Sequence, residues 1–436
     1  MLKQIELENF RAFDERVYLR LRPITVLIGR NSAGKSTLIK FLLMLQQSLS
    51  TSDEDFLRTD GDRVKLGNFA QLKNSRRKAG SLKFDLDYET TDLPDAKEMA
   101  LFLGARTIKR LSDPLTKEIK LQLTIPLESD ISHEEVAHVR VSGLVAYRSR
   151  SRIGTHRVKV TLGDEKVFDE LGQLRNPEVG LLKFPARSSS PEKAILRVFS
   201  DRFLSSIRHE LSSMQHLEAV REESSRVILV SNPPDGTVGQ RGQFALPHLQ
   251  LLMAKKGEDA DFVQTHLEAV ADVINLRFKS AGRGFVAHAT AMNRRTQMES
   301  YLSDFGFGVG QCLPIIVQGA IASPDTLLMV EQPEAQLHPT AQLAMGSYFA
   351  DLWKTRGVRS LIETHSSQII LRLRTLVAEG RLEPSDISLA FVDIDENKRP
   401  RITNLDVEPG GRLQKGLPME FFGADVLESM KLGVKK

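Results

Sequence analysis

The sequence feature that most constrains this chain is the octapeptide Gly29 to Ser36, which reads Gly-Arg-Asn-Ser-Ala-Gly-Lys-Ser. It follows the apolar run Ile24 to Ile28, which predicts a buried strand, and it leads into Ser36 to Leu45, whose apolar spacing predicts a helix. A glycine-rich turn between a strand and a helix surrounds phosphate oxygens with backbone N–H groups and the positive end of the helix dipole. The chain is therefore predicted to be an α/β protein that binds a nucleotide through its phosphates.

Each part of this loop has a predicted task. We expect the Lys35 ammonium to reach the β- and γ-phosphate oxygens and the Ser36 hydroxyl to bind Mg²⁺. Backbone N–H groups along the loop and into the helix would hold the remaining oxygens. The predicted nucleotide ligands of this segment are Gly29, Asn31, Ser32, Ala33, Gly34, Lys35, Ser36 and Thr37.

A second element combines a predicted buried strand, Leu327 to Val330, with the acid that follows it directly, Glu331. P-loop enzymes place the carboxylate that positions Mg²⁺ at the end of such a strand. We therefore predict that Ser36 and Glu331 bind the magnesium ion. Alone, an apolar strand followed by glutamate is a common structural pattern, so this assignment depends on the phosphate loop.

Two shorter segments add candidate residues. Phe305 to Gln311 is rich in glycine and precedes an apolar helix predicted for Leu313 to Ile321, so its backbone amides could grip a phosphate at a helix N-terminus. The alternative is a glycine-rich loop that only turns the chain. His365 follows the predicted strand Ser360 to Glu363, where it could contact the γ-phosphate or the attacking water, although a lone histidine can also be structural.

The middle of the chain has a different pattern. From Lys83 to Lys166 short alternating segments predict an antiparallel β lobe. Ser190-Pro191-Glu192 is typical of a helix start, which predicts helical structure to Met214, and a second helical part is predicted from Ala245 to Leu276. Two strands near the end, Ile387 to Val392 and Ile402 to Val407, are predicted to form a hairpin.

Composition excludes several classes of protein. No apolar run approaches the roughly 18 residues of a membrane span, and the N-terminus does not resemble a signal peptide, so a cytoplasmic protein without membrane contact is expected. The single cysteine, Cys312, cannot form an internal disulfide. Net charge is only +4, but Arg148, Arg150 and Arg152 belong to a basic stretch that could bind DNA or RNA. The alternative for this stretch is a solvated hairpin.

The order of these elements resembles the ABC-class ATPases of the SMC, RecF and OLD (overcoming lysogenisation defect) group. Glu331 to Pro339 resembles the group's Walker B and D-loop run, Gly308, Gly310 and Gln311 fall in its signature motif, and His365 takes the place of its H-loop histidine. Arg11 lies in a segment that looks like the group's first strand and the turn after it, and in the group the arginine of this turn reaches nucleotide phosphates. Gln71 lies where the group has its Q-loop.

The resemblance implies an ABC-type P-loop ATPase head, a mixed sheet with helices, that carries the antiparallel β lobe and a helical insertion. Its cofactors would be ATP and Mg²⁺. Two protomers would enclose ATP head-to-tail, giving a homodimer or a higher even-numbered oligomer. The corresponding domains are 1–90 and 301–436 for the two parts of the head, 91–189 for the β lobe and 190–300 for the helical insertion.

The predicted catalytic residues are Glu331, Gln332, Glu334 and His365. Gln332 stands where many relatives carry the glutamate that polarises the attacking water, and an amide cannot accept a proton, so slow hydrolysis is expected, with Glu334 or His365 compensating. Gly310 replaces a serine that touches the γ-phosphate across the dimer. The contact would then rely on backbone amides.

Three functions fit the resemblance. Compact bacterial members of this kind serve anti-phage defence together with a separately encoded effector, a nuclease or toxin, which makes an ATP-driven sensor the leading prediction. The second is a RecF-like clamp for DNA repair or recombination, with the arginines of the basic stretch on the duplex. The third is a scaffold that binds ATP with little turnover.

Overall fold

The computed structural model describes most of the chain, and along the five strands between 118 and 173 it describes the backbone pairing only. The described residues are 1–49, 58–77, 82–89, 118–125, 134–141, 144–151, 155–162, 165–173, 206–229, 233–281 and 286–414. The predicted helix start at Ser190-Pro191-Glu192 and the candidate Arg152 lie outside them. The chain divides into two compact units: unit 1 is Met1–Leu21, Asn31–Ser213 and Val392–Ile402, and unit 2 is Arg22–Arg30, Met214–Phe391 and Thr403–Lys436.

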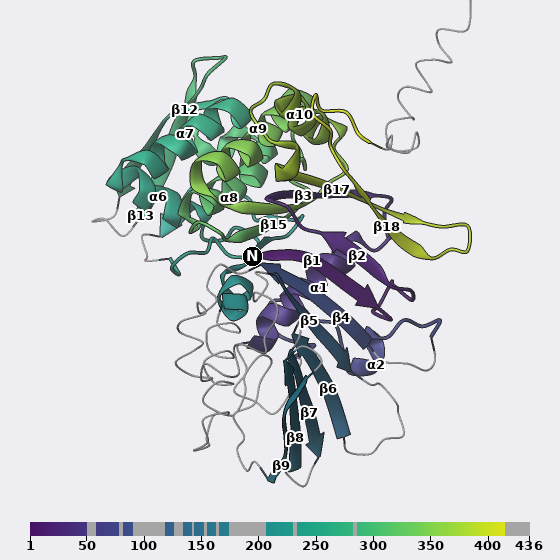
Figure 1. The fold of residues 1–436 in the computed structure, drawn as a ribbon. Helices are drawn as coiled ribbons and strands as arrows, with labels where there is room; N and C mark the ends of the chain where they lie inside the picture. The colour runs from purple at the N-terminus through teal and green to yellow at the C-terminus, as the bar shows by residue number, and fades with distance from the viewer. Residues whose placement is uncertain are drawn as a thin grey trace, which may run out of the picture. The chain divides into compact units, whose positions relative to one another are not determined.

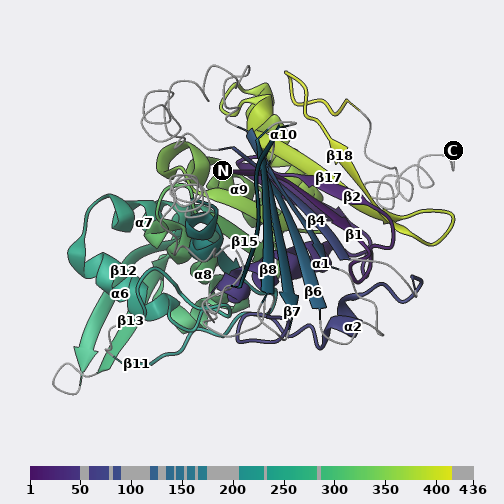
Figure 2. The ribbon, with the colours of Figure 1, turned by 60° about the horizontal axis from the view of Figure 1, so that its bottom comes forward.

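Unit 1 contains an eight-stranded antiparallel sheet, which confirms the antiparallel β lobe of the predicted fold class. Its strand order is β2-β1-β4-β5-β6-β7-β8-β9, and Figure 2 shows β6, β7 and β8 side by side. Strands of the lobe therefore continue a sheet that begins at the N-terminus. The strands are β1 (Leu2–Glu8), β2 (Val17–Arg20), β4 (Leu82–Glu89), β5 (Glu118–Ile125), β6 (Glu134–Val141), β7 (Leu144–Ser151), β8 (Thr155–Leu162) and β9 (Glu165–Gln173).

Helix α1 (Lys35–Leu49) packs on this sheet through an aromatic cluster. The ring of Phe41 on the helix lies 5.6 Å from that of Phe10 and 4.8 Å from that of Phe84 on β4, measured between centroids. The Phe10 and Phe84 rings meet edge to face at 5.7 Å, a favoured arrangement of aromatic pairs. These contacts fix the helix that begins immediately after the phosphate loop.

Unit 2 contains most of a six-stranded sheet of order β10-β15-β16-β3-β17-β18. Strands β10, β15, β16 and β3 run parallel, so their carboxyl ends lie at one edge of the sheet. Both β3 and β15 read as continuous apolar runs because a parallel strand is covered on both faces. The strands are β10 (Gln215–Leu217), β15 (Leu327–Glu331), β16 (Arg359–Glu363), β3 (Ile24–Gly29), β17 (Ile387–Ile394) and β18 (Pro400–Leu405).

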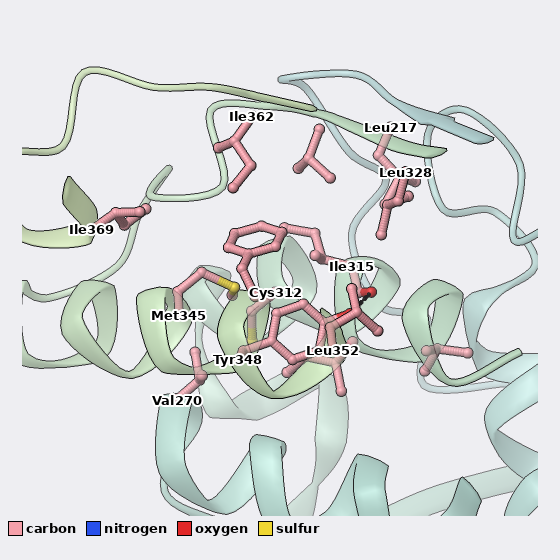
Figure 3. Close-up of a cluster of buried hydrophobic side chains, with 14 of the residues drawn as sticks. Leu217, Val270, Cys312, Ile315, Leu328, Met345, Tyr348, Leu352, Ile362 and Ile369 are labelled. Atoms are coloured by element: carbon pink, nitrogen blue, oxygen red, sulfur yellow. Dashed lines mark hydrogen bonds between the residues drawn. The ribbon is translucent and has the colours of Figure 1, made fainter. Parts of the chain in front are cut away.

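Helices of unit 2 gather beside this sheet (Figure 1). They are α6 (Ala245–Lys255), α7 (Glu258–Ala271), α8 (Phe307–Ile321), α9 (Pro339–Arg356) and α10 (Ser367–Ala378). Figure 3 shows the core between them, where Leu328 and Ile362 from the strands face Cys312 and Met345 from the helices. The described helices are all too short or too polar to cross a bilayer.

The close approach of α8 to α9 leads to a stability prediction. A Cβ atom on Gly319 of α8 would lie 2.0 Å from the Tyr348 hydroxyl, which donates a 2.7 Å hydrogen bond to the Ile315 carbonyl. Gly319→Ala should therefore lower the free energy of unfolding by about 1–3 kcal/mol, the usual cost of overpacking a core. Urea unfolding would measure it. In a Tyr348→Phe background the hydroxyl is absent and the cost should shrink; an undiminished cost would contradict the explanation.

The predicted helix from Ala245 to Leu276 is wrong over its last residues. Helix α7 ends at Ala271, because Asp272 adopts the left-handed conformation and its N–H bonds back to the Glu268 carbonyl. The chain then enters a small antiparallel sheet rather than a helix. Its strands are β11 (Ile228–Leu229), β12 (Val273–Ala281), β13 (Val286–Asn293) and β14 (Glu299–Tyr301).

The predicted terminal hairpin is confirmed. Strands β17 and β18 are neighbours in the sheet, and the turn between them is closed by a 2.8 Å hydrogen bond from the Lys398 N–H to the Asp395 carbonyl.

Candidate functional site

The phosphate-loop segment adopts the conformation that its glycines allow. Strand β3 ends at Gly29 with φ 141°, Ser32 and Gly34 follow with φ 62° and 112°, and α1 begins at Lys35. A Cβ atom on Gly34 would lie 3.1 Å from the Phe13 ring in a conformation that side chains rarely adopt. Glycine is therefore required at position 34. Lys35 is only 3% exposed, whereas Asn31 and Ser32 are exposed, Ala33 is buried, and Ser36 and Thr37 are half-buried in the first turn of α1.

The turn that carries Phe13 is held by its own backbone. Phe10 and Phe13 exchange two 2.9 Å hydrogen bonds, and the Asn74 side chain donates to the Arg11 carbonyl at 2.6 Å. Arg11 has a positive φ of 45°, and its guanidinium donates to the Leu66 carbonyl at 3.3 Å. The Arg11 guanidinium is thus bonded within unit 1 in this structure.

Gln71 lies on the short helix α2 (Phe69–Leu72) in a capping box. Its side-chain oxygen accepts from the Asn68 N–H at 3.0 Å, while the Asn68 side chain accepts from the Gln71 N–H at 3.1 Å. The Gln71 side chain is exposed, and its oxygen belongs to this cap.

The register of the six-stranded sheet brings several predicted residues to one edge. Glu331 on β15 lies level with Glu363 on β16, and Glu363 with Leu27 on β3, two residues before Gly29. The ladder continues past the strand ends, because the Gln332 N–H donates to the Glu363 carbonyl at 2.7 Å. Glu331, Gln332, the segment of His365 and the start of the phosphate loop therefore share the carboxyl edge of this sheet.

Glu331 has a partner that no sequence motif indicates. Its Oε1 lies 2.9 Å from Nε2 of His216 on β10, the next strand in the sheet. The Glu331 side chain is 20% exposed and offers oxygen, the donor that Mg²⁺ prefers. A histidine inside a three-residue strand has no sequence signature, so only the paired strands reveal it.

A buried arginine, Arg221, holds the backbone at the same place. Its guanidinium donates to the Glu331 carbonyl and, at 3.3 Å, to the Gln311 carbonyl on α8. Burial lowers the pKa of Arg221 to about 10, which still leaves the side chain charged at neutral pH. Arg221 thus ties the end of β15 to the start of α8, a role that no motif in the sequence indicates.

Glu334 and His365 are joined directly. One Glu334 carboxylate oxygen accepts from the Thr364 hydroxyl and the other from the His365 N–H, both at 2.7 Å. The carboxylate therefore fixes the segment after β15 to the segment after β16, while the His365 side chain is exposed. Both Glu334 oxygens thus accept a hydrogen bond from the segment that follows β16.

Helix α8 begins six residues earlier than predicted. Gly306, with φ 93°, is its N-cap, and Gly308, Gly310 and Gln311 lie in its first turns. No side-chain hydrogen bond caps this N-terminus, and Phe307 at its first position is 65% exposed. The backbone amides of Gly308 to Gln311 therefore lie at a helix N-terminus without a side-chain cap. Helix ends of this geometry can bind anions.

The basic stretch is described only in part. Arg148 and Arg150 lie two residues apart on β7, where they pair with Ala137 and Glu135 of β6. Within the described portion of the chain, no group of three or more histidine, cysteine or acidic residues could hold a metal ion on its own.

A sheet in which β3 opens into a phosphate loop and β15 ends in an acid defines a P-loop ATPase. The chain belongs to the AAA ATPase domain family, whose match covers residues 1–136 and 247–370, more than half of the sequence. This membership confirms the predicted class. No curated protein matched the sequence in a similarity search.

A search of solved structures matched heads of SMC proteins. The SMC head domain from Thermotoga maritima has 10% identity and a TM-score of 0.40 over 93% of this chain and 99% of its own. An SmcHead bound to the C-winged helix domain of ScpA has 9% identity and a TM-score of 0.43 over 93% and 98%. The Smc head with an extended coiled coil, bound to the C-terminal domain of ScpA derived from Pyrococcus furiosus, has 10% identity and a TM-score of 0.44 over 99% of both.

Proposed function

We propose that this protein is a molecular switch that binds and hydrolyses ATP and whose two copies close head-to-tail around two ATP molecules with Mg²⁺. The observation that carries this proposal is the uncapped start of α8 in a chain that also has a phosphate loop. Each protomer could then offer its loop to one nucleotide and its signature amides, at Gly308 to Gln311, to the nucleotide on its partner.

The residues of the loop fit a bound nucleotide. Gly34 leaves no room for a side chain, and the half-buried hydroxyls of Ser36 and Thr37 stand in the first turn of a helix. Lys35 would bind the β- and γ-phosphates, and the proposed ligands of magnesium are Ser36 and Glu331, both oxygen donors. Bound with ATP, Mg²⁺ would neutralise phosphate charge and favour attack by water on the γ-phosphate.

Turnover is proposed to be slow. Gln332 carries an amide, which cannot accept a proton from the attacking water, and its N–H is bonded to the neighbouring strand. Glu334 already accepts two hydrogen bonds. His365, with an exposed side chain, is the remaining candidate to contact the water, so the closed state should outlast that of relatives with a catalytic glutamate.

The proposal predicts nucleotide-dependent assembly. Light scattering of the full chain during size exclusion should show a shift from monomer to dimer mass, or from a dimer to a larger even-numbered assembly, with ATP and Mg²⁺ but not with ADP. A mass that does not change under any nucleotide condition would contradict the switch. Phosphate release in the same samples would separate an ATPase from a scaffold that binds ATP with little turnover.

The cellular setting is proposed from the resemblance alone: a sensor in anti-phage defence that controls a separately encoded nuclease or toxin in the cytoplasm. Arg148 and Arg150 on β7 favour one alternative, a RecF-like DNA clamp. Purification with the native neighbouring genes would distinguish them. A stoichiometric second polypeptide bound in an ATP-dependent way supports the sensor, whereas DNA binding that falls steeply with salt supports the clamp.

A further inference from the structure

The Glu331 carboxylate is bonded to a buried histidine. His216 of β10 is paired with Met329 of β15, and its Nε2 lies 2.9 Å from Oε1 of Glu331. The histidine side chain is only 4% exposed, against 20% for Glu331. The Glu331 carboxylate therefore contacts the buried imidazole and is also partly exposed to solvent.

A third residue contacts the other ring nitrogen. The Gln240 amide lies 3.2 Å from Nδ1 of His216. A carboxylate can only accept a hydrogen bond, so Nε2 carries a hydrogen and donates it to Glu331, and an amide N–H group that donates to Nδ1 matches that tautomer of the neutral ring. Both ring nitrogens of His216 are therefore bonded, one to Glu331 and the other to Gln240.

The loop that presents Gln240 is firmly held. The Gln240 carbonyl accepts from the Glu218 N–H at 2.9 Å, close to the end of β10. The neighbouring Val238 N–H donates to the Gln318 side chain on α8 at 2.8 Å. Gly239 gives the loop its turn, because its φ of 81° is a conformation that residues with side chains rarely adopt. The loop that carries Gln240 is therefore bonded both to the residue after β10 and to α8.

We propose that His216, oriented by Gln240, is a positioning residue for the magnesium-binding carboxylate of Glu331, an inference that rests on the proposed ATPase function. Its hydrogen bond occupies Oε1 and leaves Oε2 for the metal ion or a water molecule bound to it. Such outer contacts orient a ligand and prevent its rotation when the metal is absent.

The contact is specific to the carboxylate rather than to the strand. Arg221 already holds the Glu331 carbonyl, and the parallel ladder to β16 holds the strand itself. His216 therefore acts on the side-chain rotamer of Glu331. A purely structural histidine would change stability when replaced but would leave the affinity for the metal ion unchanged.

The test is the affinity of the ATP-bound full-length protein for Mn²⁺, a spectroscopic substitute for Mg²⁺, measured by electron paramagnetic resonance. His216→Ala should weaken Mn²⁺ binding roughly 10- to 100-fold, the usual cost of losing an outer-shell partner. His216→Gln, whose amide can donate from a similar position, should recover most of it. His266→Ala is the matched control, because His266 is a buried histidine of α7 whose ring packs against Phe262 and Tyr348.

A second variant covers the case in which His216→Ala does not fold. Gln240→Leu keeps the imidazole but removes the group that orients it, and it should weaken Mn²⁺ binding in the same direction, while ATP affinity in chelator stays unchanged. Equal Mn²⁺ affinity in the wild type and in the folded His216 and Gln240 variants would overturn the inference, as would an equal loss in His266→Ala. A wild-type protein that binds ATP without any effect of Mn²⁺ would overturn the proposed function itself.

Discussion

Replacing Lys35 with alanine is expected to reduce ATP affinity by roughly three orders of magnitude and to bring hydrolysis to background. The ammonium would face phosphate oxygens from the first position of α1, where it is only 3% exposed. A unit charge pair at 4 Å contributes about 4 kcal/mol when the effective dielectric constant is near 20, which corresponds to about a 10³-fold change in affinity. Titration with a fluorescent nucleotide and phosphate release would measure the two losses.

Lys40→Ala is the matched control for this experiment. Lys40 lies on the same helix, is exposed, and has no predicted contact with the nucleotide. It should bind and hydrolyse ATP like the wild type. Tight ATP binding by Lys35→Ala would show that the nucleotide does not bind to this loop.

Glu331→Gln is the second change with a large expected effect. Glutamine preserves the shape of the side chain but removes the negative charge that a hard cation prefers. A metal ion contributes several kcal/mol to stabilising the transition state, so Mg²⁺-dependent turnover should fall by at least 10²-fold. ATP binding should persist, because the phosphate loop is unchanged, and the protein should accumulate in its assembled state.

Glu331→Asp provides the comparison, since it keeps the charge and shortens the side chain by one methylene group. It should retain more activity than Glu331→Gln across a magnesium titration. If the glutamine variant hydrolyses ATP at the wild-type rate and with the same magnesium requirement, then β15 does not carry the metal ligand.

The parts of the fold that the sequence predicted are those encoded by adjacent residues. The apolar run of β3, the glycines of the loop and the spacing of α1 are contiguous, and the same holds for β15 with Glu331 and for the hairpin turn at Asp395. The helix boundary at Asp272 was missed, because a single left-handed residue ends α7 inside a segment of helical composition.

The contacts around Glu331 could not be predicted, because they join residues that are far apart along the chain. His216 reaches Glu331 only through the pairing of β10 with β15, and Arg221 reaches it across a hundred or so positions of sequence. The start of α8 was placed too late for another reason. Gly308 and Gly310 are typical of loops, yet the first turns of a helix tolerate them.

The position of β3 in its sheet has a consequence for how the protein is made. Its neighbours are β16 and β17, so this apolar strand leaves the ribosome long before either partner has been synthesised. Through most of translation, six residues that are all buried in the finished protein must stay solvated or be protected by other factors. The phosphate loop that follows β3 can therefore take its final form only when the last part of the chain has emerged. A ribosome-bound or truncated fragment that ends before residue 359 would lack both strands that flank β3, and so would lack the support of a nucleotide site.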